Sequence, residues 1–176
     1  MDKLVELIVS FKCVYDAEKL IKKRFLAFIQ KNADCFDRHL ESGHITASAF
    51  IFDPEKSKIL LLHHKKLNKW LQPGGHCDGD KDTLSVAIKE VFEETGLVIE
   101  NQGQRIFDLD IHTIPAYKGI IEHEHFDVRY LLLADSSIPL IQNHETNQLK
   151  WIDLAEMEDF TTEASLIRMK NKLALV

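Results

Sequence analysis

Hydrophobic positions in the first 42 residues follow a helical period, and neither Pro nor Gly interrupts them before Gly43. From Asp16 onward, apolar residues recur at steps of three and four, which is the spacing of one face of an amphipathic helix. These positions are Ala17, Leu20, Ile21, Phe25, Phe28 and Ile29. The pattern predicts a helical N-terminal extension, residues 1–42, packed on a main domain of residues 43–176. The same stripe could instead form the contact surface of a homodimer.

After Gly43 the pattern changes to short apolar runs. Residues 45–52 and 58–63 are partly β-branched and flank a turn-forming segment that contains Pro54, so they predict a β-hairpin. Residues 71–79 are rich in Gly and predict a loop. Further strands are expected at residues 97–100, 105–112, 126–134 and 149–152, and a last helix at about residues 163–174.

A helix with clear start and stop signals lies between the predicted loop and these strands. Asp82 and Thr83 can cap its first turn, and Gly96 stands where a left-handed residue commonly ends a helix. The order of elements is helices, hairpin, loop, helix, strands and helix. It predicts an α/β or α+β fold in which a helix packs on a mixed sheet.

Composition narrows the classes of function. The chain has 176 residues with 22 Lys and Arg against 28 Asp and Glu, a net charge of −6, which argues against polymeric nucleic acid as a partner. No apolar run has the roughly 18 residues that a membrane span needs. Three scattered cysteines argue against a disulfide framework, so we expect reduced thiols and a cytoplasmic location.

Three carboxylates crowd one face of the predicted helix. Glu90, Glu93 and Glu94 are neighbours at three- and four-residue spacing, where like charges repel and cost helix stability. Hard cations such as Mg²⁺ or Mn²⁺ take oxygen ligands and would relieve that repulsion next to a phosphate. The alternative is a solvated acidic face. Gly74 and Gly75, which precede the helix and allow close backbone approach, favour the metal site.

The segment from residue 75 to residue 97 resembles the signature motif of the Nudix family. Gly75 is followed after five residues by Lys81, and after seven more by Lys89 and the run EVFEETGL, which keeps the family's spacing. Lys81 stands where the family has Glu, and Lys89 stands where it has Arg. Lys89 keeps the charge but loses the planar guanidinium fork. Three neighbouring carboxylates could substitute for the missing Glu: Asp78, Asp80 and Asp82.

The resemblance implies a Nudix-type α/β/α sandwich that hydrolyses a diphosphate bond in a nucleoside diphosphate linked to another group. By motif position, Glu90, Glu93 and Glu94 would bind Mg²⁺ or Mn²⁺, with the Gly74 carbonyl as a further ligand. Glu94 and Glu93 would be catalytic, and Gly75 and Lys89 would support the site. The partner would be a small phosphorylated substrate, such as a nucleotide derivative. The alternative is a non-catalytic Nudix-fold module that binds a nucleotide or a partner protein.

The resemblance also implies a general base outside the motif, on a late loop ahead of a strand that carries a Trp. Glu145 lies six residues before Trp151 and is the first candidate for this base. His144 competes with it, because its unperturbed pKa lies near neutrality. The alternative for both residues is a polar surface loop.

Alternating polar residues mark a second candidate site. On a strand, His123, His125, Asp127 and Arg129 share one face. We expect them to line a pocket opposite the carboxylate helix, with His112 on a neighbouring strand. Imidazoles with a carboxylate suit a transition metal and Arg suits a phosphate, so these five residues are predicted to bind substrate or metal. A half-exposed strand with alternating polar residues is the alternative.

Overall fold

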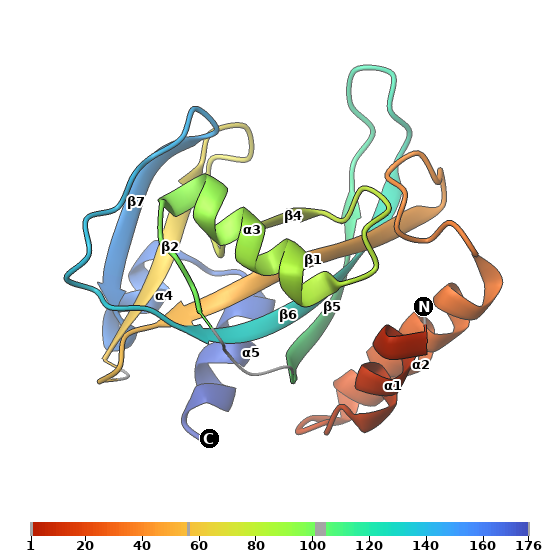
Figure 1. The fold of residues 1–176 in the computed structure, drawn as a ribbon, viewed down its shortest axis with the longest axis horizontal. Helices are drawn as coiled ribbons and strands as arrows, with labels where there is room; N and C mark the ends of the chain where they lie inside the picture. The colour runs from red at the N-terminus through yellow and green to blue at the C-terminus, as the bar shows by residue number, and fades with distance from the viewer. Residues whose placement is uncertain (1, 56, 101–104, 176) are drawn as a thin grey trace.

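The computed structural model describes residues 2–55, 57–100 and 105–175 (Figure 1). Two helices come first, followed by strands that alternate with three further helices and one 3-10 turn. The elements are α1 (Asp2–Ser10), α2 (Asp16–Lys31), β1 (Gly43–Phe52), β2 (Lys58–His64), β3 (Lys69–Leu71), β4 (Gly74–His76), α3 (Thr83–Thr95), β5 (Ile106–Ile114), β6 (His123–Leu133), β7 (Thr146–Asp153), η1 (Leu154–Glu156), α4 (Met157–Phe160) and α5 (Ala164–Leu173). Among the described residues, no helix combines the length and the hydropathy of a membrane span.

The mixed sheet predicted from the sequence is confirmed, but β1 and β2 are paired over only part of their length. β1 runs parallel to β6, whereas the other strand pairs are antiparallel, in the order β3-β2-β1-β6-β5. The predicted hairpin of β1 and β2 is present, but the two strands pair only at Ile51–Leu60 and Phe52–Ile59. Further along, β1 pairs with β4 and β2 pairs with β7. The strands therefore form two wings that separate beyond the hairpin.

Two cores, one on each face of β1, build the layers. Val91 of α3 is buried with Ala47 and Val128, so α3 covers one face of the sheet. Leu166 of α5 is buried with Phe50 on the other face. These layers give the predicted α/β/α arrangement (Figure 1).

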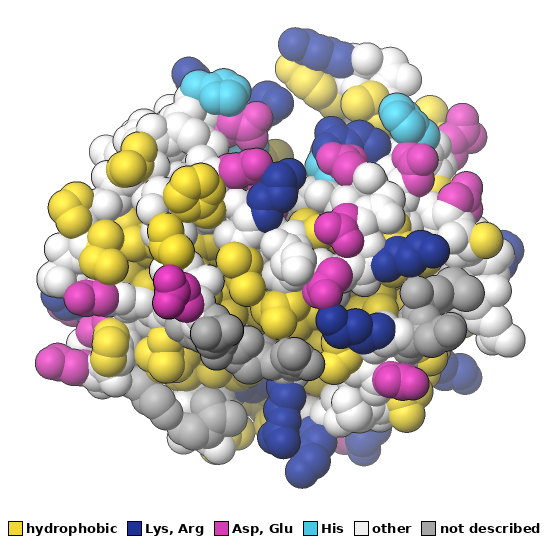
Figure 2. Space-filling view, in the orientation of Figure 1, with side chains coloured by type: hydrophobic (Ala, Val, Ile, Leu, Met, Phe, Trp, Pro, Cys, Tyr) yellow, Lys and Arg dark blue, Asp and Glu magenta, His cyan; other side chains and the backbone are white. Residues whose placement is uncertain are grey.

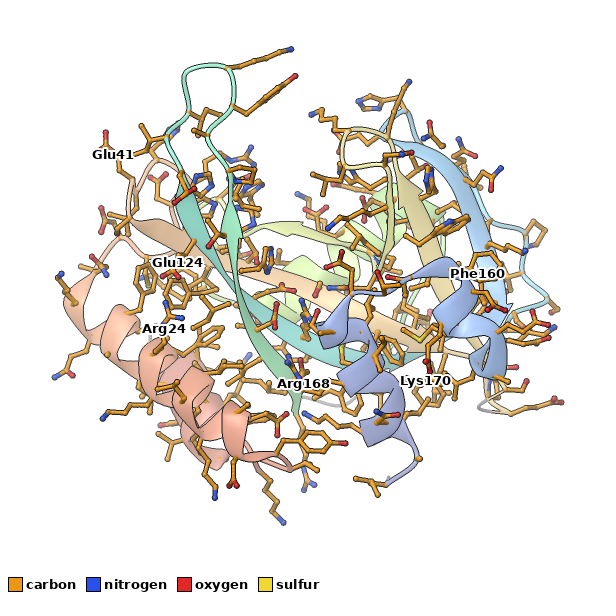
Figure 3. All side chains as sticks on the ribbon, turned by 180° about the vertical axis from the view of Figure 1, so that it is seen from behind. Arg24, Glu41, Glu124, Phe160, Arg168 and Lys170 are labelled. Carbon is orange, nitrogen blue, oxygen red and sulfur yellow. The ribbon has the colours of Figure 1, made fainter. Side chains whose placement is uncertain are left out.

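The N-terminal helices lie beside β5 and β6 at one end of the sheet. The ring of Phe28 stacks on Phe126 at a centroid distance of 3.9 Å, and Phe25 meets the same ring edge-on at 5.3 Å. The Arg24 guanidinium donates to the Glu124 carboxylate at 2.7 Å, and Figure 3 labels both residues. The helix predicted from Asp16 is confirmed, and it uses aromatic contacts to reach the sheet.

Three local expectations are wrong. Residues 97–100 do not form a strand. The apolar side chains of Leu97 and Ile99 are buried in the core, but the backbone of this segment pairs with none of the described strands. The predicted loop at residues 71–79 contains the three-residue strand β4, which pairs with β1. On α2, Leu20 is 63% exposed, while Glu18 is fully buried. Glu18 can be buried because its carboxylate accepts backbone N–H groups and the Lys172 ammonium.

Candidate functional site

Helix α3 carries the acidic residues, and local sequence signals fix both of its ends. The Asp82 carboxylate accepts the Ser85 N–H at 3.2 Å and caps the first turn. Gly96 ends the helix in the left-handed region with φ of 74°. The Thr83 hydroxyl and the Tyr130 hydroxyl are 2.7 Å apart, which ties the N-terminal end of the helix to β6. The carboxylates therefore project from a fixed scaffold.

Two glycines of β4 let its backbone run against these carboxylates. The Gly74 N–H donates to the Glu94 carboxylate at 3.0 Å, and Glu94 is only 6% exposed. A Cβ atom at Gly75 would lie 2.6 Å from the carboxyl carbon of Glu90. Because only glycine leaves that space free, β4 brings its main chain beside both Glu90 and Glu94.

The electrostatics of this region fit a cation. The pKa of Glu94 is raised to about 8, first by burial and also by the negative charges of Glu90, Glu145 and Glu93, while the hydrogen bond from the Gly74 N–H acts in the opposite direction. Burial and the charge of Glu93 also raise the pKa of Glu90. Carboxylates that are costly to ionise together and lie beside a polar backbone are the donor set that a divalent metal would stabilise.

Glu93 lies apart from its two neighbours. It is exposed, and its carboxylate is 3.5 Å from the Lys89 ammonium one turn earlier. Across the described parts of the chain, the one group of three His, Cys or acidic residues whose ligand atoms all lie within 4.8 Å contains no carboxylate of α3. The structure thus brings Glu90 and Glu94 to β4 but leaves Glu93 outside.

The acidic residues near Lys81 have local partners. Asp78 contacts the Arg38 guanidinium through both oxygens, and its pKa is lowered chiefly by that contact. Asp82 caps α3 and pairs with Lys3 at 2.7 Å. Asp80 accepts the N–H of Asp82. The three carboxylates therefore shape the loop ahead of α3.

The two candidates for the general base differ in their placement. Glu145 is exposed on the loop before β7, and its backbone carbonyl accepts the Lys65 N–H at 2.9 Å. Its charge contributes to the raised pKa of both Glu90 and Glu94. The neighbouring His144 side chain is 91% exposed, and its imidazole is 3.8 Å from Glu145. The negative charge of Glu145 therefore acts on Glu90 and Glu94, and its catalytic role stays a prediction.

A polar stripe occupies the other face of β1, β6 and β5, on the side of α5. Strand register places the side chains in three rows, each spanning the three strands. The rows are His44–His125–His112, Thr46–Asp127–Asp110 and Ser48–Arg129–Asp108. The apolar core of Phe50 and Leu131 follows directly after the last row. The stripe thus changes along the strands from imidazoles to carboxylates to a guanidinium.

Asp127 and Arg129 are already bonded to each other inside the stripe. Arg129 is 3% exposed, and its Nε donates to Asp127 at 2.7 Å while its Nη2 donates to Asp110 at 3.1 Å. Asp127 also accepts the hydroxyls of Thr46 and Ser48. These contacts occupy both oxygens of Asp127, whereas Nη1 of Arg129 is buried without a hydrogen-bond partner and lies 3.7 Å from Asp108. Direct substrate binding by either residue stays a prediction, and for Asp127 it requires this network to open.

The histidines form one cluster that includes two residues absent from the sequence prediction. His44 of β1 and His76 of β4 join His112, His123 and His125, and ring centroids of neighbouring members are 4.7 to 5.4 Å apart. The pKa of His44 is lowered to about 4, first by burial and then by the neighbouring His76 and His123. Burial followed by the neighbouring rings also lowers the pKa of His125. The two rings are therefore neutral.

The surface between the two wings is hollowed. Figure 2 shows the depression between the loops of β2 and β7 and the connection of β5 and β6, with charged side chains of both signs around it. Burial and the charge of Arg38 lower the pKa of His76, whereas the charges of Asp78 and Glu145 act in the opposite direction. The histidine cluster is thus within electrostatic reach of Glu145, whose charge also acts on Glu90 and Glu94.

Comparison with known proteins agrees with the motif. A family model described as NUDIX domain matches residues 43–172. A Lactococcus lactis protein named probable DHNTP pyrophosphohydrolase is 33% identical over 90 residues, which are 50% of this chain and 52% of that protein. An RNA pyrophosphohydrolase of Sphingopyxis alaskensis is 28% identical over 102 residues, covering 51% of this chain and 63% of that protein.

A solved structure supports the same assignment. The structure of a Nudix-family hydrolase from Clostridium perfringens is 26% identical, with a TM-score of 0.51, and the match covers 75% of this chain and 97% of that one. The chain spans less than two thirds of the length of the curated relatives named above. Since the domain match covers most of the sequence, the chain belongs to the Nudix family.

Proposed function

We propose that the protein hydrolyses a diphosphate bond in a nucleoside diphosphate linked to another group, with Mg²⁺ or Mn²⁺. The single observation that carries the proposal is the placement of buried Glu94 against the Gly74 N–H, with the charges of Glu90 and Glu145 acting on it. Two relatives are named as pyrophosphohydrolases, which supports hydrolysis over a purely binding role.

The proposed division of labour follows the geometry. Glu94 and Glu90 would hold the metal between α3 and β4, with the Gly74 carbonyl as a further ligand. Glu93, a ligand by motif position, would have to exchange its ion pair with Lys89 for the metal. A bound divalent cation would supply charge neutralisation for the diphosphate and a lowered pKa for attacking water. Lys89 holds Glu93 on the outer side of the helix through their 3.5 Å ion pair. Glu145 would take up the proton of the attacking water, since it is an exposed carboxylate outside α3 whose charge acts on both Glu90 and Glu94.

Binding of substrate or of a metal is proposed for the polar stripe, through His112, His123, His125, Asp127 and Arg129. Arg129 and Asp127 would act mainly by holding the strands and the stripe in register, because they are bonded to each other. The half-buried His123 and His125 stand closer to solvent. The partner is a small phosphorylated molecule of nucleotide type. The net charge of −6 argues against long nucleic acid.

The test is hydrolysis of a nucleotide panel in Mg²⁺ by the wild-type chain and by Glu94→Gln. We expect the substitution to lower kcat by at least about 100-fold with little change in melting temperature, because the amide still accepts the Gly74 N–H. Glu158→Gln, an exposed residue of α4 paired only with Lys170 among the described contacts, is the matched control. Wild-type turnover by the Glu94 variant would refute the proposal.

Location and assembly complete the proposal. Cys13, Cys35 and Cys77 are free thiols, which supports a reducing cytoplasm. A homodimer would use the outer face of α2, where Leu20 is exposed. Sedimentation of the full chain and of Leu20→Glu tests this contact, and a monomer at all concentrations would contradict it.

A further inference from the structure

The histidine cluster has the composition of a metal site made by strand pairing. His44 and His125 are direct partners in the parallel pair of β1 and β6, and their ring centroids are 4.7 Å apart. His123 lies 5.1 Å from His44 and 5.2 Å from His125. One ligand nitrogen from each of these three rings lies within 4.8 Å of the others. Figure 3 shows the strands from the side of α5, with the labelled Glu124 next to this row.

Several nitrogens in the cluster have no hydrogen-bond partner. His44 is 2% exposed, and both of its ring nitrogens are buried without a well-formed hydrogen bond, although the Leu40 carbonyl acts on the ring. Nε2 of His125 is also buried and unpaired. Buried polar atoms in native proteins are nearly always satisfied, so unpaired imidazole nitrogens that face one another indicate a missing partner. That partner must accept several nitrogen lone pairs, which is what a metal cation does.

A hydrogen bond made by one nitrogen of a ring leaves the other nitrogen of that ring free to bind a metal. Nδ1 of His123 lies 2.8 Å from the Ile121 carbonyl, which can only accept, so Nδ1 carries the proton and Nε2 is free to bind. Nδ1 of His112 lies 3.3 Å from the Asp110 carboxylate. Histidines that bind metals commonly donate their other N–H to a carbonyl or a carboxylate in this way.

We infer that His44, His123 and His125 bind one divalent transition metal of the zinc class, at a site distinct from the carboxylates of α3. Neutral imidazoles favour zinc, copper or nickel over Mg²⁺, which prefers oxygen. Zinc–nitrogen bonds of about 2.0 to 2.1 Å place tetrahedral ligands about 3.4 Å apart, so modest ring rotations close the present spacing. Asp127 is not a ligand, because Arg129, Thr46 and Ser48 occupy its oxygens.

The site joins three segments that the chain brings together from far apart. His44 opens β1, and His123 and His125 open β6, while His76 of β4 packs 5.0 Å from His44 and 5.1 Å from His125. The fourth position of a tetrahedral site falls to one of the adjoining rings or to water. A bound ion would therefore fix the first residues of β1 and β6 to each other.

The experiment measures metal binding by the full chain and does not depend on hydrolysis. The protein is stripped with a chelator and placed in excess Mg²⁺ to occupy the carboxylates. It is then titrated with Co²⁺, followed by visible absorption, and with Zn²⁺, followed by bound metal per chain. The variants are His44→Ala, His123→Ala and, as the matched control, His39→Ala, an exposed histidine outside the cluster.

We expect one Zn²⁺ per wild-type chain, a tetrahedral-type Co²⁺ spectrum and a rise in melting temperature. His44→Ala and His123→Ala should weaken Zn²⁺ binding by more than about 100-fold, since even losing an outer partner costs 10- to 100-fold. His39→Ala and Glu94→Gln should bind Zn²⁺ as the wild type does. If His44→Ala does not fold, the half-exposed His123 variant decides. Absence of binding in the wild type, or wild-type binding in both cluster variants, overturns the inference.

Discussion

At the scale of single residues, the space left by two missing side chains controls where the carboxylates of α3 can go. Gly74 and Gly75 have ordinary backbone angles for a strand, so close approach rather than conformation requires them to be glycine. A Cβ atom at Gly74 would meet Ser48 Cβ at 2.3 Å and the Ala47 carbonyl at 2.8 Å. At Gly75 its three nearest atoms would all belong to the Glu90 carboxylate. Gly74 is therefore needed for the close packing of β4 on β1, and Gly75 for the position of the Glu90 carboxylate.

This difference gives a prediction for Gly75→Ala. The new methyl group displaces a side-chain carboxylate that can rotate away, so we expect a change in the free energy of unfolding within about 1 kcal/mol. Metal affinity should fall by roughly tenfold or more, because Glu90 leaves its place beside β4. Calorimetric titration with Mn²⁺ measures the affinity.

Gly74→Ala is the comparison for the same experiment. Its methyl group meets backbone and a Cβ that cannot rotate away, so it should lower the melting temperature in the absence of metal. Equal effects of the two substitutions on stability, with unchanged Mn²⁺ affinity for Gly75→Ala, would contradict the proposed role of Glu90.

At the scale of elements, those with local sequence signals could be predicted, whereas those that depend on pairing with a distant strand could not. Helix α3 could be predicted because its caps, Asp82 and Gly96, and its apolar period all lie within one short stretch. β4 could not, since a Gly-Gly-His segment has neither period nor β propensity and forms only by pairing with β1. Residues 97–100 have the apolar content of a strand without a partner.

The candidate site divides in the same way. The motif places Glu90 and Glu94 on one helix, and their spacing is visible in the sequence. His44 and His76 come into the histidine cluster only through the pairing of β1 with β6 and with β4, about which the sequence spacing says nothing. Arg129 could be placed on the correct face, but its ion pairs with Asp108 and Asp110 depend on the register of β5 against β6.

The C-terminal stop of α3 gives a prediction at this scale. Gly96 has φ of 74°, and a Cβ atom there would lie 2.8 Å from Cβ of Ile141. Gly96→Ala should therefore lower the free energy of unfolding by about 2 kcal/mol, from left-handed strain plus the clash. Urea denaturation measures this loss, and Ile141→Ala in the same chain should recover the part due to the clash. No loss in the single variant would show that the loop containing Ile141 yields freely.

At the scale of the whole molecule, one buried ion pair joins the two ends of the chain. The Lys172 ammonium of α5 donates to the Glu18 carboxylate of α2 at 2.5 Å and to Asp108 of β5 at 2.9 Å. Glu18 and Asp108 are fully buried, and the Arg168 guanidinium, labelled in Figure 3, also donates to Asp108 at 2.6 Å. The N-terminal extension is thus attached to the sheet through charge as well as through its aromatic rings.

Glu18→Gln tests whether this attachment makes the extension part of one cooperative unit. Burial by itself raises the pKa of Glu18, but the bonds from Lys172 and from the N–H groups of Tyr15 and Val14 outweigh it and lower the pKa below 4.5. The stabilisation is therefore present above about pH 4.5 and lost as the pH falls through the lowered pKa. At pH 7 the substitution should cost about 3 kcal/mol, since it leaves a buried ammonium with one partner fewer.

Two probes read the outcome separately. Trp70 and Trp151 both lie within the domain of residues 43–176, so their fluorescence reports that domain, whereas far-ultraviolet circular dichroism also reports α1 and α2. In urea at pH 7, both transitions of Glu18→Gln should move together to lower urea, and the difference from wild type should shrink as the pH falls through the lowered pKa of Glu18. Asp16→Asn, which breaks an exposed pair with Lys19 on the same helix, should leave both unchanged. If dichroism alone shifts, the extension unfolds independently, and the ion pair joins two units that do not share a transition.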